Sequence, residues 1–123
     1  MFKKSGNTLY ITWGDHGFIT LSREGKVFKA NETVNVNIYR ESEMNIAPIR
    51  TWTTGVLNTD TEEVTIEVFP EETELESPIT EPTKYWWEAT CGDETFIGYD
   101  EQGPKILNLY PGGISTEVDD GND

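Results

Sequence analysis

Apolar and polar side chains alternate in short stretches along most of this chain. Successive side chains of an extended strand point to opposite faces, so this alternation predicts strands with one buried face. The clearest case is residues 34–39, in which Val34, Val36 and Ile38 alternate with Asn and Tyr neighbours. Further strands are expected over residues 9–13, 18–21, 27–28, 51–54, 64–68, 84–90, 95–99 and 106–110. Turns rich in Gly, Pro, Asn and Asp separate these stretches, and convincing helical periodicity is missing.

A series of about eight short strands divided by turns is typical of an all-β domain. We expect an antiparallel Ig-like β-sandwich of about 7–9 short strands, because a parallel sheet would need crossover helices that this sequence lacks. Residues 7–113 are predicted to form a single domain, preceded by a lead-in at residues 1–6. Residues 114–123 are polar and acidic, so we expect a mobile tail there.

The stretch 84–90 contains adjacent tryptophans whose side chains must lie on opposite faces of one strand. The pattern places Tyr85, Trp87 and Ala89 in the core and leaves Trp86 on the outer face. Because Trp and Tyr are enriched at interfaces, exposed aromatics favour a protein partner, with a sugar-stacking platform as the alternative. A partly covered sheet face is a third reading. The outer patch that we predict comprises Tyr39, Trp52, Phe69 and Trp86.

Residues 70–83 form an acidic segment with three prolines and five glutamates. Proline cannot donate to a strand ladder, so no strand is expected here. Residues 71–75 are predicted to form one helical turn, in which carboxylates near the N-terminus are favourable. We expect Leu75 and Ile79 to hold the segment against the sandwich edge, while its remaining surface is either solvated or a contact surface. The candidate contact residues in it are Glu71, Glu72, Glu74 and Glu76.

The net charge of −14 is concentrated in the second half of the chain. Residues 1–59 carry seven Lys/Arg and five Asp/Glu, a net charge of +2, whereas residues 60–123 carry two and eighteen, a net charge of −16. Binding of a phosphate backbone needs clustered Lys and Arg, so nucleic acid is not an expected partner. The acidic half favours solubility, a basic protein partner, a divalent cation or mimicry of a nucleic-acid surface.

Signals for membranes and secretion are missing from this sequence. No stretch of about 18 apolar residues occurs, so no membrane span is predicted. The N-terminal residues lack the apolar run of a signal peptide, and the single cysteine excludes an internal disulfide. Both features fit synthesis in a reducing cytoplasm.

Residues that usually carry catalysis or bind metals are scarce. His16 is the single histidine and Cys91 the single cysteine, which falls short of the three or four N/S ligands of a zinc site. Neither has a recognisable partner for a catalytic triad, and acidic neighbours disfavour a Cys91 thiolate, so we expect Cys91 to be a packing residue at a strand end. Carboxylate clusters at residues 93–94, 100–101 and 119–123 keep calcium (Ca) as an alternative to solvated turns, although none has EF-hand spacing. We expect no enzyme and no cofactor.

Several short motifs occur in one order along the chain. They are ITWGDHGFITL at residues 11–21, GKVF at 25–28, ETVNVNIY at 32–39, VTIEV at 64–68, PEET at 70–73, KYWWEA at 84–89 and GPKIL at 103–107. This order resembles the N-terminal Ig-like module of upper baseplate and tail-fibre-associated proteins of phages that infect Gram-positive bacteria, over about residues 8–110. One departure is that Asn31 and Glu32 stand where these modules have a second Gly-Asp.

The resemblance implies an Ig-like sandwich and a virion protein that docks onto other phage structural proteins. We also expect homo-oligomers and neither a nucleic-acid nor a membrane partner. In such proteins a long extension follows the module, so this shorter chain is expected to be a free-standing accessory subunit of the baseplate or tail. We predict a non-enzymatic structural or adaptor protein, made in the bacterial cytoplasm and located in the virion. Two alternatives stay open: a small acidic phage-encoded inhibitor of a basic host protein, and a carbohydrate-binding sandwich module.

Overall fold

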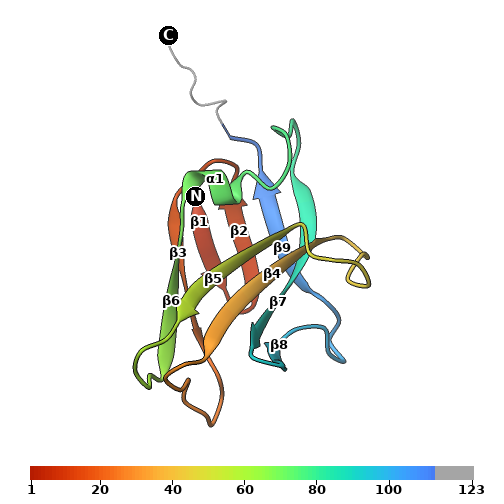
Figure 1. The fold of residues 1–123 in the computed structure, drawn as a ribbon. Coiled ribbons are helices and arrows are strands. Elements are labelled where there is room, and N and C mark those ends of the chain that lie inside the picture. Colours follow the sequence, from red (N-terminus) through yellow and green to blue (C-terminus); the bar gives the residue numbers. More distant parts are fainter. Residues whose placement is uncertain (113–123) are drawn as a thin grey trace.

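The computed structural model describes residues 1–112, which fold as nine β-strands and one short helix (Figure 1). The elements are β1 (Phe2–Ser5), β2 (Thr8–Thr12), β3 (Gly17–Ser22), β4 (Thr33–Arg40), β5 (Arg50–Val56), β6 (Glu63–Val68), α1 (Pro70–Thr73), β7 (Thr83–Cys91), β8 (Glu94–Ile97) and β9 (Lys105–Tyr110). The all-β sandwich predicted from the alternation is confirmed. Residue 113 and the predicted tail at residues 114–123 lie outside the described residues.

Seven strands form one curled sheet in the order β1-β2-β9-β7-β4-β5, with β8 paired to the last residues of β7. β3 and β6 form a separate two-stranded ribbon. The ribbon contacts the large sheet at both edges, β3 at β1 and β6 at β5, so it closes over the open side of the curled sheet (Figure 1). Within residues 1–112, side chains rather than a backbone ladder join these two layers.

One strand pair departs from the antiparallel arrangement that the sequence predicts. β2 and β9 run parallel, with Leu9 opposite Leu107 and Ile11 opposite Leu109. A hairpin imposes antiparallel pairing on strands that are neighbours in sequence, whereas β2 and β9 lie far apart in the chain and have no such constraint. All other paired strands of the described chain are antiparallel.

Inward-facing side chains of both layers meet in one continuous core. The register between β4 and β7 places Val36 opposite Ala89 and Ile38 opposite Trp87, and all four are buried. Trp87 also donates its indole N–H to the Asn7 carbonyl oxygen at 3.1 Å, so its polar group is satisfied. The ribbon contributes Ile19, Leu21, Val64, Ile66 and Val68. The inward position predicted for Trp87 is confirmed.

The lead-in expected at residues 1–6 contains a strand instead. This strand, β1, pairs with β2 at the edge of the large sheet, and its Phe2 packs against Gly17 of β3. A Cβ added at Gly17 would lie 2.1 Å from Cγ of Phe2, so glycine alone allows the ribbon to approach β1 this closely. Apart from Phe2, the residues of β1 are exposed, which is why its sequence has no alternating pattern.

The strand expected at residues 27–28 is replaced by a single bridge. Phe28 and Thr61 exchange backbone hydrogen bonds of 2.7 and 2.8 Å. The preceding turn contains another isolated bridge, between Arg23 and Lys26. These loops lie at the end of the sandwich opposite α1 (Figure 1).

The two tryptophans of β7 are expected to differ strongly in their effect on stability. Trp87→Ala removes a fully buried side chain and should lower the free energy of unfolding by about 3–5 kcal/mol. Trp86→Ala removes a partly exposed side chain and should cost about 1 kcal/mol. Urea unfolding of both variants measures the difference, and the reverse order would contradict the assignment of the two faces.

Candidate functional site

The acidic segment after β6 forms a cap over one end of the sandwich (Figure 1). Its backbone carbonyls point toward donors of β5: Arg50 donates from Nη1 to the Glu71 carbonyl oxygen at 3.0 Å and from Nη2 to that of Glu74 at 3.1 Å. The Trp52 indole N–H donates to the Glu72 carbonyl oxygen at 3.0 Å. Because a single helical turn leaves its carbonyls without partners, these donors stabilise α1. The predicted helical turn is confirmed.

Thr73 joins the cap to the turn between β2 and β3. Its side chain is buried, and its Oγ1 accepts the Gly14 backbone N–H at 2.9 Å and donates toward the Asp15 carbonyl oxygen at 3.0 Å. Gly14 has a φ of 85°, which glycine adopts without strain. Trp13, in the same turn, donates its indole N–H to the Glu76 carbonyl oxygen at 2.9 Å. The turn and the cap therefore form one hydrogen-bonded unit.

The Glu76 carboxylate is held by two side chains of the large sheet. Tyr85 donates its hydroxyl to Oε1 at 2.8 Å, and Arg40 donates from Nε to Oε2 at 2.7 Å. Burial, together with the Glu76 carboxylate, raises the pKa of the Tyr85 hydroxyl above its ordinary value. Glu72 is also engaged, because its Oε1 accepts the Phe69 backbone N–H at 3.1 Å. Two of the four acids predicted as contact residues therefore stabilise the fold.

Two aromatic residues predicted for the outer patch are buried instead. Trp52 is 0% exposed, because the β4–β5 register sets it opposite Val36 on the inner face. Tyr39 lies on the outer face opposite Trp86, but it is almost completely covered, and its hydroxyl donates to Glu88 Oε2 at 2.9 Å. The predictions of an exposed Trp52 and an exposed Tyr39 are wrong.

Phe69 and Trp86, the other residues of the predicted patch, are accessible but lie on different layers. Trp86 is on the outer face of the large sheet, opposite Tyr39 of β4 and Ile106 of β9. Phe69 directly follows β6 of the ribbon and is 47% exposed. The predicted patch therefore divides into two separate aromatic surfaces.

Phe69 forms an exposed cluster with His16 and Phe18, which we call the ribbon patch. The His16 ring stacks on Phe69 with centroids 5.7 Å apart and an interplanar angle of 22°, and it meets Phe18 edge-on at 5.2 Å. His16 Nε2 lies 2.8 Å from Glu67 Oε2, which fixes the imidazole beside both phenyl rings. Phe18 is 56% exposed because its neighbours in β3 take the inward positions. The exposure of Phe18 could have been recognised from the sequence, because Phe18 takes an outward position in the alternation of β3.

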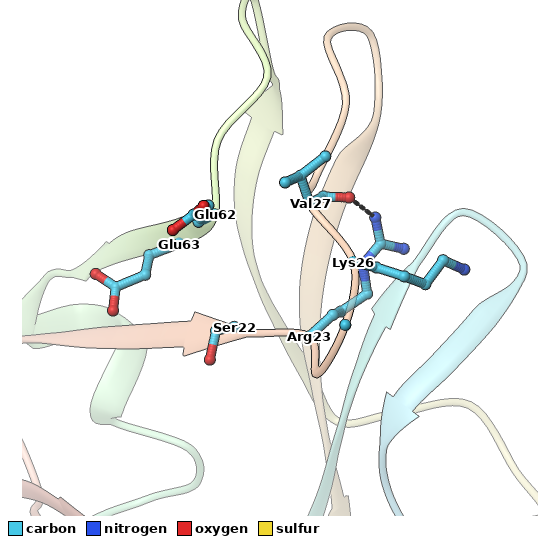
Figure 2. A pocket seen from close by; sticks show the side chains of 7 residues that line it. Ser22, Arg23, Lys26, Val27, Glu62 and Glu63 are labelled. Atoms are coloured by element: carbon cyan, nitrogen blue, oxygen red, sulfur yellow. Dashed lines mark hydrogen bonds between the residues drawn. The ribbon is translucent and has the colours of Figure 1, made fainter.

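Two hollows of about 510 and 550 Å³ flank the loop that follows β3, at the end of the sandwich opposite α1. Arg23 lines both, and its side chain is 5% exposed. Figure 2 shows the first hollow, where Arg23 donates to the Val27 carbonyl oxygen. Its Nη1 also donates to Glu94 Oε1 at 2.8 Å, and its Nη2 to Glu32 Oε1 at 3.3 Å. Arg23 therefore braces the surrounding loops, and the protein itself neutralises its charge.

The first hollow carries charges of both signs. Arg23 and Lys26 line one side, and Glu62 and Glu63 line the other, with the Glu63 side chain directed away from Arg23 (Figure 2). The buried Nε of Arg23 has no hydrogen-bond partner among the described residues, although the guanidinium lies 4.6 Å from the Phe28 ring centroid. This arrangement holds the loops together and does not concentrate charge of one sign.

Cys91 is buried at the end of β7, which confirms its prediction as a packing residue. Burial, with a hydrogen bond to Glu32, raises the pKa of its thiol and so disfavours the reactive thiolate. Among residues 1–112, no group of three or more His, Cys, Asp or Glu side chains is arranged to hold a metal ion. In the same part of the chain, no helix has the length and apolar character needed to cross a membrane.

Comparison with protein-family models, curated proteins and solved structures gives no match to this chain. The resemblance to phage baseplate modules therefore remains a hypothesis.

High pH tests the burial of Tyr39. Burial and the adjacent Glu88 raise its pKa to about 12, above the unfolded value of about 10. The stability from such a group is fully present below about pH 10 and is lost as the pH rises toward about 12, because the unfolded chain ionises first. In urea titrations, the free energy of unfolding should fall over this window, and less steeply for Tyr39→Phe. Equal slopes for the two proteins would contradict this role of Tyr39.

Proposed function

We propose that this chain is a non-enzymatic protein-binding module that serves as a structural or adaptor subunit of a bacteriophage virion. The observation that carries the binding role is the ribbon patch, where Phe18 and Phe69 are both exposed around His16. Exposed aromatic side chains grouped on one surface are typical of contact surfaces. The ribbon patch is therefore the best candidate for contact with a protein partner.

The ribbon patch combines an aromatic centre with an acidic border. Glu67 lies opposite Phe18 in the β3–β6 register, and Glu71 lies in the first turn of α1, two residues beyond Phe69. Aromatic side chains at the centre of an interface contribute most of its binding free energy, while charges at the border add orientation and speed of association. The partner is expected to present an apolar surface bordered by Lys or Arg.

The patch is ordered before any partner arrives. The contact between His16 and Glu67 holds the imidazole, and the Phe69 backbone is held by its N–H bond to the Glu72 carboxylate. A surface that is already ordered loses less conformational entropy on binding. The acidic cap therefore supports the patch, even though two of its carboxylates are not contact residues themselves.

The phage assignment is supported by the resemblance and by the turns that carry it. Gly14 and Gly25, which belong to the motifs, have φ angles of 85° and 73°, so both glycines occupy positions that favour glycine. A sandwich is also the fold that the resemblance implies. We propose other phage structural proteins of the baseplate or tail as partners.

Purified virions test the phage assignment directly. The chain is expected in them at a fixed ratio to another tail protein, because a structural subunit has a defined copy number. Quantitative mass spectrometry with labelled peptides of this chain measures that ratio. Virions that lack the chain would contradict the assignment.

Substitutions in the ribbon patch test the contact surface. Phe18→Ala and Phe69→Ala should each weaken binding to the tail proteins of dissociated virions by about 2 kcal/mol, or about 30-fold, because each removes an aromatic anchor. Tyr99→Ala is the matched control, since Tyr99 is a similarly exposed aromatic residue on the other layer. Binding measured by biolayer interferometry should also weaken with salt. An effect of Tyr99→Ala equal to that of Phe18→Ala would place the contact elsewhere.

A further inference from the structure

We propose that the outer face of the large sheet binds a neutral saccharide. Trp86 and Tyr99 would supply the stacking surface, and Glu88 and Asn37 the hydrogen bonds to sugar hydroxyls. This face lies on the layer opposite the ribbon patch, so the proposal is independent of the protein contact described above.

The outer face carries little charge, although the chain as a whole has a net charge of −14. The outward positions of the inner strands β2, β4, β7 and β9 and of β5 hold mainly Thr, Asn, Tyr and Trp, and Lys84 and Glu88 are the charged side chains among them. Further charges lie at the border of the face, with Lys3 on the edge strand β1 and two acids directly after Tyr99. Hydroxyl, amide and aromatic groups together suit a ligand that has both O–H groups and apolar C–H faces. A pyranose sugar has this combination.

Trp86 and Tyr99 form an angled aromatic pair at the surface. Their ring centroids are 5.7 Å apart with an interplanar angle of 64°, and Tyr99 is 62% exposed. Gly98 allows the loop to fold back closely on β8, because a Cβ there would lie 2.7 Å from Thr95 Cγ2. The close approach of this loop places Tyr99 beside Trp86.

A fixed network of polar side chains lies next to this pair. Glu88 Oε2 accepts from Asn37 Nδ2 at 3.1 Å and from the Tyr39 hydroxyl at 2.9 Å, and Asn37 Oδ1 accepts from Thr51 Oγ1 at 2.9 Å. Glu88 is two residues from Trp86 on the same face of β7, so a sugar stacked on the indole is within reach of the network. Carboxylate and amide groups both form hydrogen bonds with hydroxyl groups, so Glu88 can accept from a bound sugar and Asn37 can donate to it or accept from it.

The chemistry of the face also narrows the class of sugar. Flat aromatic rings pack best against pyranoses whose equatorial substituents leave an apolar C–H face, as in β-linked glucose and N-acetylglucosamine. The negative charge of the chain and the Glu88 carboxylate disfavour uronic acids and other anionic sugars. The expected ligands are therefore neutral β-linked oligosaccharides of these two sugars.

Titration of the ¹⁵N-labelled chain with cellohexaose and with chitohexaose tests the proposal. At least one of them should shift the Trp86 indole and Tyr99 amide signals, with a dissociation constant of about 1 mM. Trp86→Ala and Tyr99→Ala should each weaken binding at least about tenfold, which is the loss expected of an aromatic anchor. Tyr99→Ala alters an exposed loop residue, so its effect does not depend on the stability of the sandwich.

Phe18→Ala is the matched control and should leave saccharide binding unchanged, whereas it should weaken binding at the ribbon patch about 30-fold. The proposal is overturned if neither oligosaccharide shifts these signals at about 10 mM. It is also overturned if Trp86→Ala and Tyr99→Ala both bind the oligosaccharides as tightly as the unmodified chain. Tighter binding of polygalacturonate than of the neutral oligosaccharides would overturn the assignment to neutral sugars.

Discussion

The rest of the structure depends on one constraint, which is that the β3–β6 ribbon must cover the curled seven-stranded sheet. The inner face of the sheet presents large apolar side chains, including Trp52 and Trp87, which must leave water for the fold to be stable. The ribbon covers them with alternate residues of only two short strands. It can do so only by close approach, which Gly17 permits where Phe2 packs against it.

This constraint also determines which side chains face outward and can contact other molecules. Every second residue of the ribbon is committed to the core, so the side chain of Phe18 must face outward. The cap closes the end of the same core, and the donors Arg50 and Trp52 bind its carbonyls. As a result, the acidic segment is anchored by its backbone, and Phe69, which precedes it, has a defined position beside His16. The fold and the proposed contact surface share these interactions.

The fold was predictable from the sequence wherever alternation was clear, as at Trp86 and Trp87 in β7. It was not predictable around Trp52, because a run of threonines gives no indication of which face is buried, and only pairing with β4 settles it. The ribbon patch was missed for a related reason. His16 meets its partner Glu67 across the β3–β6 ribbon, 51 positions later in the chain, and local patterns carry no information on such contacts. Local patterns are equally uninformative about the indole N–H groups of Trp13, Trp52 and Trp87, which donate to carbonyl oxygens far away in the chain.

The parallel pairing of β2 and β9 has a mechanical consequence. The two strands point the same way, so a pull between the start of β2 and the end of β9 acts along the strands in opposite directions. All hydrogen bonds of the pair then share the load at once, rather than opening one after another as in a hairpin pulled from its ends. The β2–β9 pair is therefore expected to resist a pull between these two ends.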